Sequence, residues 1–463
     1  MQVIGKATKN TRPKMKIKTV KWTNHPILGN LVLDLINPST NLPYETIIFA
    51  GENGAGKTTI LESISKFLNI GSFEFFEEIE YIIDGKIYKA VQPSNQSTVK
   101  DFFDIIDDQG TRTSIHSNRN NNKQSIETNL LDIRHYGCVF SKARADYKTN
   151  QISYATTKQL DIDKYDIDNE DDFTSLKQLI VDVHNQDNSE YAETNKNLGS
   201  SPKTWDDFYP ISKTFRFKNA FDTFFVNLTF DKVIDDNSEK VIQFKKNNRS
   251  ISIDNLSTGE KQIVFRGIYL LRNNQQLKSS AIMIDEPELS LHPKWQQNIL
   301  KYYKNLFTDS GIQTAQLFIA THSEYVIKDA LQQQEKTLVI ILKDNLGIIE
   351  NHNIIAPSTL PSITSAETNF LAFNVVSNDY HIELYGYLQQ KENKLTIKSC
   401  DEFIKNHLEY NTTIHSKPSS FGTTNYETLS TYIRNAIDHP EPTKIYSNHE
   451  LKISIELLIK LCQ

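Results

Sequence analysis

The segment Gly51–Thr59, with the sequence GENGAGKTT, carries residue types that could hold a nucleotide phosphate. Glycines at the spacing G-x-x-x-x-G-K-[ST] let successive backbone N–H groups turn inward and form a concave anion site. A helix that begins near Lys57 would add its positive N-terminal dipole. Lys57 would reach the β- and γ-phosphates, and the hydroxyl of Thr58 would bind Mg²⁺. We therefore expect ATP and Mg²⁺ here, with contacts from a set of loop residues: Asn53, Gly54, Gly56, Lys57, Thr58 and Thr59.

The flanking segments favour a phosphate loop over a glycine-rich turn without a ligand, which is the alternative. An apolar, β-branched run before the loop, from Ile47 to Phe49, predicts a strand. Apolar residues after the loop recur at helical spacing, at positions 60, 61, 64, 67 and 68. A strand, a glycine-rich turn and a helix in this order are the context that the motif requires.

Further segments downstream could complete a site for phosphate chemistry. These are LSTGEKQ (256–262), SSAIMIDEPELSLHP (279–293) and QLFIATHS (316–323). The apolar run AIMID predicts a buried parallel strand that ends in two carboxylates, Asp285 and Glu286. Such a pair on its own could equally be a helix cap. Beside a phosphate loop, however, carboxylates can serve Mg²⁺ and act as a general base.

In this order, the motifs resemble those of ATP-binding-cassette ATPases, in particular the soluble branch that includes SMC, RecF and OLD proteins. The resemblance spans residues 14–345, with insertions. It implies an α/β fold, in which a P-loop ATPase head carries a β-rich arm and a helical lobe insertion. It also implies that Asp285 supports Mg²⁺, that Glu286 is the catalytic general base for the attacking water, and that His322 contacts the γ-phosphate.

The segment LSTGE matches the signature motif of the same family. The resemblance implies that Ser257, Gly259 and Glu260 contribute to a surface that contacts ATP bound to the other subunit. A hydroxyl, a glycine backbone and a helix N-terminus can together form a second anion site. We therefore expect a homodimer, or a higher homo-oligomer, with ATP sandwiched between subunits and with hydrolysis opening the dimer.

The branch of the family can be narrowed. The interval between Thr58 and Leu256 is too short for the coiled-coil arms of SMC proteins and lacks sustained heptads. DEPELSLHP resembles the OLD and bacterial anti-phage defence ATPases more closely than importer ATPases. Residues 357–463, however, lack the acidic pattern of the Toprim nuclease that OLD proteins carry.

Two roles of the family pattern are not assigned to a clear residue: the glutamine that follows a strand, and the aromatic residue that stacks on the nucleotide base. Ser141 follows a strand at the place where the family has a glutamine, and Gln151 is the nearest candidate. Trp22 could stack on the nucleotide base, or it could be a core residue of a strand.

The segment after residue 357 looks mainly helical, is interrupted by HSKPSSFG, and contains another spacing of chemical interest. Arg434 and His439 fit R-N-x-x-x-H, which resembles the motif of HEPN ribonucleases, as in PrrC-type anticodon nucleases. The resemblance implies that His439 moves protons and Arg434 stabilises phosphate charge. Residues five apart diverge by about 140° on an ideal helix, so His439 could approach Arg434 only if Pro440 ends the helix. The alternatives are an inactive bundle, or a helix end whose side chains bind local carbonyls.

Length and composition fit a soluble protein of several domains. The 463 residues have room for about two to four domains. We place the ATPase head at 1–356, with insertions near 72–135 and 159–240, and a helical C-terminal domain at 357–463. Hydrophobic residues make up 38% of the chain, and no apolar run approaches the ~20 residues of a membrane helix. Three dispersed cysteines favour reduced thiols in the cytoplasm over disulfides or a zinc site.

Several functions remain open at this point. The first is an ATP-gated switch of bacterial antiviral defence that controls nuclease output, through RNA or tRNA cleavage by its own tail or through a partner nuclease. The second is a RecF-like ATPase of DNA repair, and the third is an ATPase scaffold that holds a separate nuclease or toxin. The net charge of −6 means that an RNA or DNA partner would need a local basic patch. We expect no membrane partner.

Overall fold

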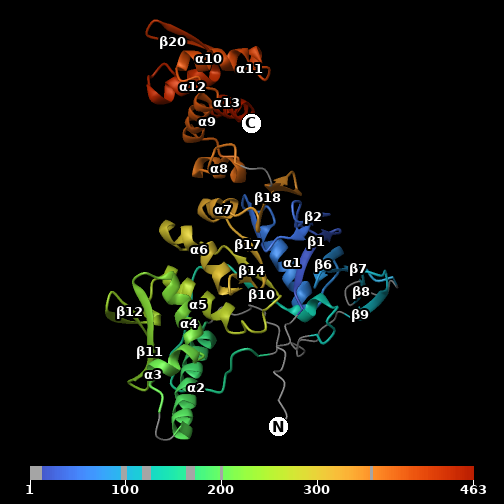
Figure 1. Ribbon diagram of the computed structural model, residues 1–463, viewed down its shortest axis with the longest axis vertical. Helices are drawn as coiled ribbons and strands as arrows, with labels where there is room; N and C mark the ends of the chain where they lie inside the picture. The colour runs from blue at the N-terminus through green and yellow to red at the C-terminus, as the bar shows by residue number, and fades with distance from the viewer. Residues whose placement is uncertain (1–12, 95–101, 117–126, 163–172, 199–201, 355–357) are drawn as a thin grey trace, which may run out of the picture. The chain divides into compact units, whose positions relative to one another are not determined.

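The structure is a computed structural model that describes residues 13–94, 102–116, 127–162, 173–198, 202–354 and 358–463 (Figure 1). The chain divides into two compact units. The first comprises residues 1–326 and 333–353, and the second comprises residues 327–332 and 354–463. The phosphate loop and the motifs at 256–262, 279–293 and 316–323 lie in the first unit, whereas R-N-x-x-x-H lies in the second.

Within the described residues, a six-stranded sheet with the order β10-β14-β17-β5-β18-β19 forms the centre of the first unit. Its strands are β5 Thr46–Gly51, β10 Cys138–Ser141, β14 Ala281–Asp285, β17 Gln316–Ala320, β18 Thr337–Asn345 and β19 Ile348–Ile354. The pairs from β10 through β18 are parallel. Every residue of β5, β14 and β17 is buried, as expected for strands that are covered on both faces.

The register of this sheet brings distant parts of the sequence to one edge. Asp285 at the end of β14 pairs with Ala320 at the end of β17, and Ala320 pairs with Phe49 near the end of β5. In a parallel sheet the carboxyl ends of the strands share an edge, and ligands of α/β proteins bind there. The phosphate loop, Glu286 and the loop with His322 therefore leave the sheet side by side.

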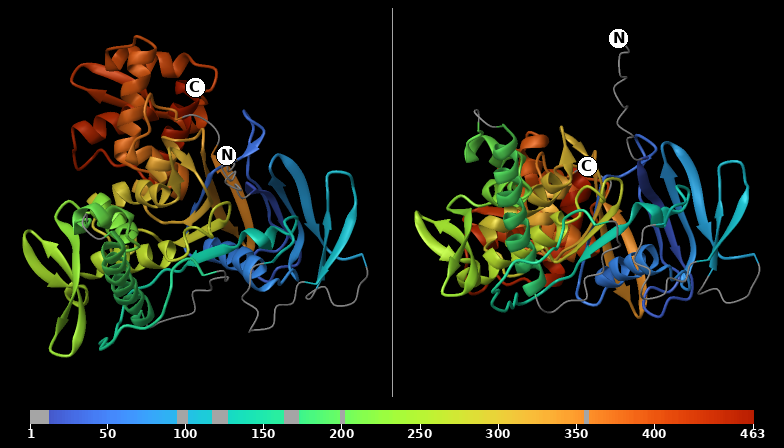
Figure 2. Two further views of the ribbon diagram at one scale, coloured as in Figure 1. Left: turned by 60° about the horizontal axis from the view of Figure 1, so that its bottom comes forward. Right: turned by 90° about the horizontal axis from the view of Figure 1, so that it is seen from below.

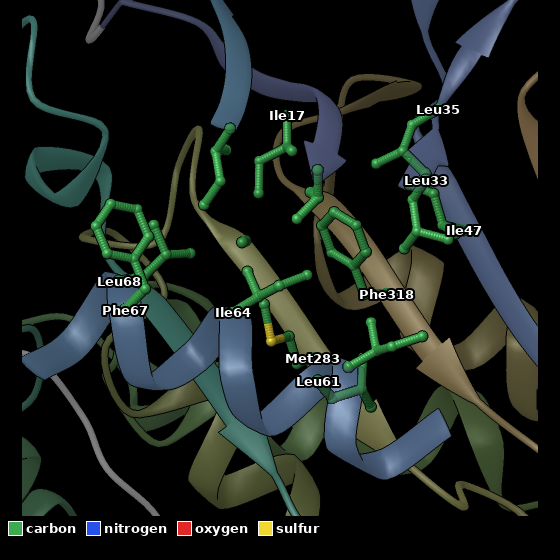
Figure 3. Close-up of a cluster of buried hydrophobic side chains, with 14 of the residues drawn as sticks. Ile17, Leu33, Leu35, Ile47, Leu61, Ile64, Phe67, Leu68, Met283 and Phe318 are labelled. Carbon is green, nitrogen blue, oxygen red and sulfur yellow. The ribbon is translucent and has the colours of Figure 1, made fainter. Parts of the chain in front are cut away.

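Helix α1 (Lys57–Ile70) follows the phosphate loop and packs against the sheet. Figure 3 shows Leu61 and Ile64 of α1 close to Met283 of β14 and Phe318 of β17. These four side chains belong to one buried core that the parallel sheet shares with the antiparallel sheet described next. The helical spacing of apolar residues after the loop thus provides the surface that holds α1 in place.

An antiparallel sheet with the order β2-β1-β6-β7-β8-β9 forms the β-rich arm that the sequence predicts. Its strands are β1 Met15–Trp22, β2 Val32–Asp34, β6 Phe76–Ile83, β7 Lys86–Val91, β8 Phe102–Ile106 and β9 Arg112–His116. The polar composition of residues 113–125 predicts a loop, but residues 113–116 belong to β9, and residues 117–125 lie outside the described residues. Two short pairs, β3 (Ile36–Asn37) with β4 (Leu42–Pro43) and β15 (Thr308–Asp309) with β16 (Ile312–Gln313), complete the strands of this unit outside the lobe.

The lobe that carries the signature motif combines helices with a small antiparallel sheet (Figure 2). Its elements are α2 Thr174–Leu198, α3 Trp205–Phe208, α4 Phe215–Phe224, β11 Leu228–Asp236, β12 Glu239–Lys246, β13 Arg249–Ser252 and α5 Thr258–Leu271. Helix α5 contacts α2, α4 and β10, so the lobe is joined to the central sheet. Helices α6 (Pro293–Leu306) and α7 (Glu324–Leu331) follow β14 and β17.

The second unit is mainly helical and has its own apolar core. Its elements are α8 Ser365–Phe373, α9 Asn378–Lys391, α10 Ile397–Asn406, α11 Thr412–His415, β20 Ser416–Phe421, β21 Thr424–Thr428, α12 Leu429–Asp438 and α13 Asn448–Cys462. The interruption at HSKPSSFG is the antiparallel pair of β20 and β21. Cys400 and Cys462 are buried in this core as free thiols. In the part of the chain that the structure describes, no helix is both long and apolar enough to cross a membrane.

Candidate nucleotide-binding site

The loop between β5 and α1 has the backbone conformation of an anion site. Gly51, Gly54 and Gly56 have φ angles of 134°, 83° and 84°, a region that favours glycine. At Gly51 a Cβ atom would lie 2.1 Å from the carbonyl oxygen of Leu342 on β18, so a larger residue does not fit. Gly56 is the N-cap of α1 and makes no side-chain cap. The first N–H groups of the helix are the donors that a phosphate can use.

The loop residues predicted to contact the nucleotide differ in exposure. Asn53, Gly54 and Thr58 are exposed, and Thr59 is half-buried. Gly56 and Lys57 are buried. The exposed residues line the open side of the loop, and the buried ones set its shape.

Lys57 folds onto the loop. Its Nζ atom donates to the carbonyl oxygens of Gly51 at 3.0 Å and Glu52 at 2.8 Å. Burial lowers the pKa of this ammonium group, and nearby carboxylates, led by that of Glu286, oppose the effect. A positive charge held at the loop is what phosphate oxygens require.

Thr58 and Asp285 face each other. Thr58 Oγ1 donates to Oδ1 and Oδ2 of Asp285, with both distances 3.1 Å. Burial raises the pKa of Asp285 to about 6; the bond from Thr58 opposes this rise and the charge of Glu286 adds to it. Hydroxyl and carboxylate oxygens are the ligands that Mg²⁺ prefers, and a cation here would compensate the buried carboxylate. The residues present therefore fit Mg²⁺.

Glu286 and His322 form the partly exposed edge of the site. Nε2 of His322 lies 3.8 Å from Oε1 of Glu286, and the two side chains are 32% and 33% exposed. Glu286 has a φ of 43°, a left-handed conformation that costs a non-glycine residue about 1–3 kcal/mol and is common at functional sites. Burial lowers the pKa of His322, Lys57 lowers it further, and Glu286 opposes both. The net effect lowers the pKa of His322 and favours the neutral imidazole.

The signature residues form the start of α5. Ser257 is the N-cap and accepts from the N–H of Glu260 at 3.4 Å, while a Glu260 carboxylate oxygen accepts from the N–H and Oγ of Ser257 at 2.9 and 2.7 Å. Glu260 is only 2% exposed and pairs with Lys246 at 2.7 Å. Burial favours a higher pKa for Glu260, but the bonds from Lys246 and Ser257 prevail and lower it. Within this chain Glu260 caps its helix, and the ATP contact expected of it stays a prediction.

Gly259 lies against the loop that follows β14. A Cβ atom at this position would be 2.8 Å from the carbonyl oxygen of Ser290 and 3.4 Å from side-chain atoms of Leu291 and Trp295. Close packing therefore accounts for this glycine within one chain. Ser257, at the start of α5, and Ser290, in the loop after β14, are both exposed.

Comparison with known proteins agrees with this arrangement of motifs. Residues 47–328 match the protein family described as "AAA domain, putative AbiEii toxin, Type IV TA system". The chain belongs to this AAA family. The matched segment of the AAA protein extends from β5 to α7 and includes the phosphate loop, the signature residues, Asp285, Glu286 and His322.

Relatives of this AAA protein include two that are named as ATPases of retrons. It is 25% identical over 370 residues to "Retron Vc95 probable ATPase" of Vibrio cholerae serotype O1 biovar El Tor, and the match covers 65% of this chain and 70% of the relative. It is 37% identical over 90 residues to "Retron Ec83 probable ATPase" of Escherichia coli, covering 18% of this chain and 16% of that relative. Membership of the family and these relatives support ATPase activity.

Solved structures with similarity to this chain include two SMC heads. One is titled "Crystal structure of the SmcHead bound to the C-winged helix domain of ScpA", with 14% identity and a TM-score of 0.39 over 73% of this chain and 98% of that chain. The other is "SMC head domain from Thermotoga maritima", with 13% identity and a TM-score of 0.36 over 74% of this chain and 100% of that chain. The fold of the AAA head rests on its own strand order and on the loops that its strands carry.

Arg266 belongs to the site but is not among the residues predicted from the sequence. It lies on α5, is 2% exposed, and donates to the carbonyl oxygens of Asp285 and Lys142 at 2.6 Å and of Glu286 at 3.2 Å. It thereby joins the signature helix to the end of β14 and to the segment after β10. An arginine within the apolar side of the predicted helix, between Phe265 and Ile268, is a signal that could have indicated this role.

Glu288 is a second residue of the site that the sequence does not reveal. Its Oε1 atom accepts from Thr321 Oγ1 at 2.8 Å and from the N–H of His322 at 2.7 Å. Burial raises the pKa of this carboxyl group, and the bonds from His322 and Thr321 oppose the rise. A glutamate two residues after Glu286 is indistinguishable in sequence from a solvated surface residue.

Trp22 and Gln151 differ in burial: Trp22 lies in the core, whereas Gln151 is exposed. Trp22 is 1% exposed, donates from Nε1 to Ser63 Oγ at 3.1 Å, and packs against Phe76 with ring centroids 5.5 Å apart. It is a core residue, so the base-stacking role considered for it is wrong. Ser141 is buried at the end of β10 and Gln151 is exposed. That Gln151 takes the place of the glutamine of the family pattern stays a prediction.

In the second unit, α12 ends at Asp438, immediately before His439 and Pro440. The guanidinium group of Arg434 pairs with the Asp438 carboxylate at 2.6 Å and donates to Asn435 Oδ1 at 3.0 Å. The N–H of His439 donates to the carbonyl oxygen of Asn435 at 2.9 Å, and its side chain is exposed. Arg434 thus has an anionic partner on its own helix, and that partner would compete with a phosphate.

Proposed function

We propose that this protein is an ATP-hydrolysing dimeric switch of bacterial antiviral defence that acts in the cytoplasm. ATP with Mg²⁺ binds at the phosphate loop of one subunit, and α5 of a second copy covers it. The dimer closes when ATP is bound and opens again after hydrolysis. The observation that supports this most strongly is the convergence of a phosphate loop, a hydroxyl–carboxylate pair and a glutamate–histidine pair at one edge of a parallel sheet.

Each side chain of the site has a part in the proposed hydrolysis. Lys57 and the loop N–H groups bind phosphate oxygens. Thr58 and Asp285 would hold Mg²⁺, which supplies positive charge to the β- and γ-phosphates. Glu286 accepts a proton from water as the water oxygen bonds to the γ-phosphorus and the bond to the β–γ bridging oxygen breaks, giving ADP and phosphate. An N–H of the His322 ring would donate a hydrogen bond to a γ-phosphate oxygen.

The surface at the start of α5 supports a site shared between two copies. The exposed hydroxyl of Ser257 lies at the N-terminus of a helix whose dipole favours an anion. Gly259 permits the loop with Ser290 to approach that helix closely. In a two-fold dimer, each copy would give its phosphate loop to one ATP and its signature surface to the other.

The output, we propose, is a nuclease that belongs to a partner protein held by the closed dimer. The pairing of Arg434 with Asp438 favours this version over cleavage of RNA or tRNA by the tail itself. Cleavage by the tail is the second candidate, because His439 is exposed directly after the end of α12. It would require Asp438 to release Arg434. A DNA-binding role like that of RecF would need a basic groove on a chain of net charge −6.

Mixing two inactive variants tests the shared site. Lys57→Ala removes phosphate binding, and Ser257→Arg blocks the signature surface. Half of the dimers in an equal mixture are mixed, and each mixed dimer keeps one intact site of two, so about a quarter of the wild-type ATPase rate should return. Neither variant alone should recover activity. Absence of recovery in a mixture shown to contain mixed dimers, by capture through two different tags, would exclude the arrangement.

A further inference from the structure

A closed ring of hydrogen bonds joins the loop after β14 to the loop at the end of β17. Oε1 of Glu288 accepts from Thr321 Oγ1 at 2.8 Å, and Thr321 Oγ1 accepts from the N–H of Ser323 at 3.0 Å. Ser323 Oγ donates to Gln296 Oε1 at 2.7 Å, and Gln296 Nε2 donates to the carbonyl oxygen of Leu291 at 3.0 Å. The N–H of Leu291 donates to the carbonyl oxygen of Glu288 at 3.0 Å and closes the ring.

One side of this ring holds the backbone of His322. The same Oε1 atom of Glu288 accepts the N–H of His322 at 2.7 Å, and the imidazole lies 3.8 Å from Glu286. Thr321 and Ser323, on either side of the histidine, are 0% and 6% exposed. Hydrogen bonds to a carboxylate are stronger than those between neutral groups, so the two donors on Oε1 of Glu288 hold this loop in place.

The other side of the ring contains the segment that meets the signature helix. Ser290 lies between Glu288 and Leu291, has a φ of 62°, and presents the carbonyl oxygen against which Gly259 packs. Its side chain is exposed. A second copy that docks on the signature surface would therefore press on a segment that is part of the ring.

We propose that Glu288 is a positioning residue that couples the Ser290–Leu291 segment to His322. Docking of a second copy on this segment sets the position of the histidine through the ring. The inference rests on the proposed ATP hydrolysis and deepens it by naming the link between dimer contact and catalysis. Glu288 acts through Thr321 and the His322 backbone, and not on the nucleotide.

Two substitutions of Glu288 separate its hydrogen bonds from its charge. Glu288→Gln keeps an amide oxygen that can accept both bonds, and Glu288→Ala removes both. We expect Glu288→Ala to lower kcat by about 10- to 100-fold with KM for ATP unchanged, and Glu288→Gln to stay within about threefold of wild type. Gln296→Ala breaks the ring away from the histidine and should also lower kcat. Glu335→Ala removes an exposed carboxylate and is the matched control.

Amide hydrogen exchange of the peptide 318–326, measured without nucleotide, provides a readout that does not depend on ATPase activity. Exchange should be at least about tenfold faster in Glu288→Ala, because the His322 amide loses its acceptor, and near wild type in Glu288→Gln. Unchanged exchange and kcat in Glu288→Ala would overturn the inference. Equal losses in Glu288→Gln and Glu288→Ala would overturn it as well, because charge would then be the cause. A wild-type protein without ATPase activity would refute the proposed function, while the exchange result would still test the ring.

Discussion

Replacement of Gly259 by alanine tests two roles of this signature glycine. The glycine either permits close packing within its own chain or serves only to contact ATP bound to a partner subunit. Gly259 lies in the first turn of α5, where the carbonyl oxygen of Ser290 comes close. If the packing role holds, the variant should lose stability even without nucleotide and without a second copy. If only the partner contact matters, the isolated chain should gain stability.

The expected magnitude follows from two opposing effects. Alanine is favoured over glycine inside a helix by about 1 kcal/mol. The new Cβ atom, however, would lie 2.8 Å from a backbone oxygen and 3.4 Å from atoms of Leu291 and Trp295. A backbone oxygen cannot rotate away, so the helix or the loop must move, and overpacking of this kind costs about 1–3 kcal/mol. We therefore expect a net loss of about 1 kcal/mol in the free energy of unfolding.

Urea unfolding of the Gly259→Ala variant, without ATP and at a concentration where the protein is monomeric, measures this loss. Gly386→Ala is the matched control, because a Cβ at Gly386 in α9 meets no atom within 4 Å; it should stabilise the second unit by up to about 1 kcal/mol. Gly259→Ala should also reduce kcat by at least about tenfold, since displacement of the Ser290 loop disturbs the catalytic geometry. A variant that loses ATPase activity yet resists urea as well as wild type would refute the packing argument.

Three further predictions concern Glu286, the buried Arg266, and the R-N-x-x-x-H residues of the second unit. Glu286→Gln should keep ATP binding but reduce hydrolysis by at least about 100-fold and leave an ATP-dependent dimer visible in size-exclusion chromatography; hydrolysis at the wild-type rate would exclude Glu286 as the general base. Arg266→Met should lower the free energy of unfolding by about 2 kcal/mol or more, because buried carbonyl oxygens lose their donor; urea unfolding at the wild-type midpoint would contradict the bridging role. Arg434→Ala and His439→Ala should leave ATP hydrolysis unchanged, and loss of RNA cleavage in both variants, assayed with total tRNA, would assign the nuclease to the tail.

Features that depend on neighbouring residues could be predicted from the amino-acid sequence. The positive-φ glycines and the start of α1 follow from the spacing in GENGAGKTT, because backbone freedom and helix initiation are local properties. The α/β fold of the head, with its β-rich arm and the helical C-terminal unit, is confirmed, since the apolar runs and their periods are also local. The end of α12 before Pro440 has the same origin, because proline restricts the residue that precedes it.

Which side chains meet across the chain depends on how the strands and helices pack. The parallel register aligns Asp285, Ala320 and Phe49, and so brings loops from three distant segments to one edge. Packing then places Trp22 in the core and directs the Arg266 guanidinium group to the backbone at the end of β14. Burial, ion pairing and hydrogen bonding depend on neighbours that are distant in the sequence, and the residue type alone does not encode them. For that reason the sequence predicts the phosphate loop, whereas the hydrogen bonds from Glu288 to the loop of His322 can be identified only in the folded chain.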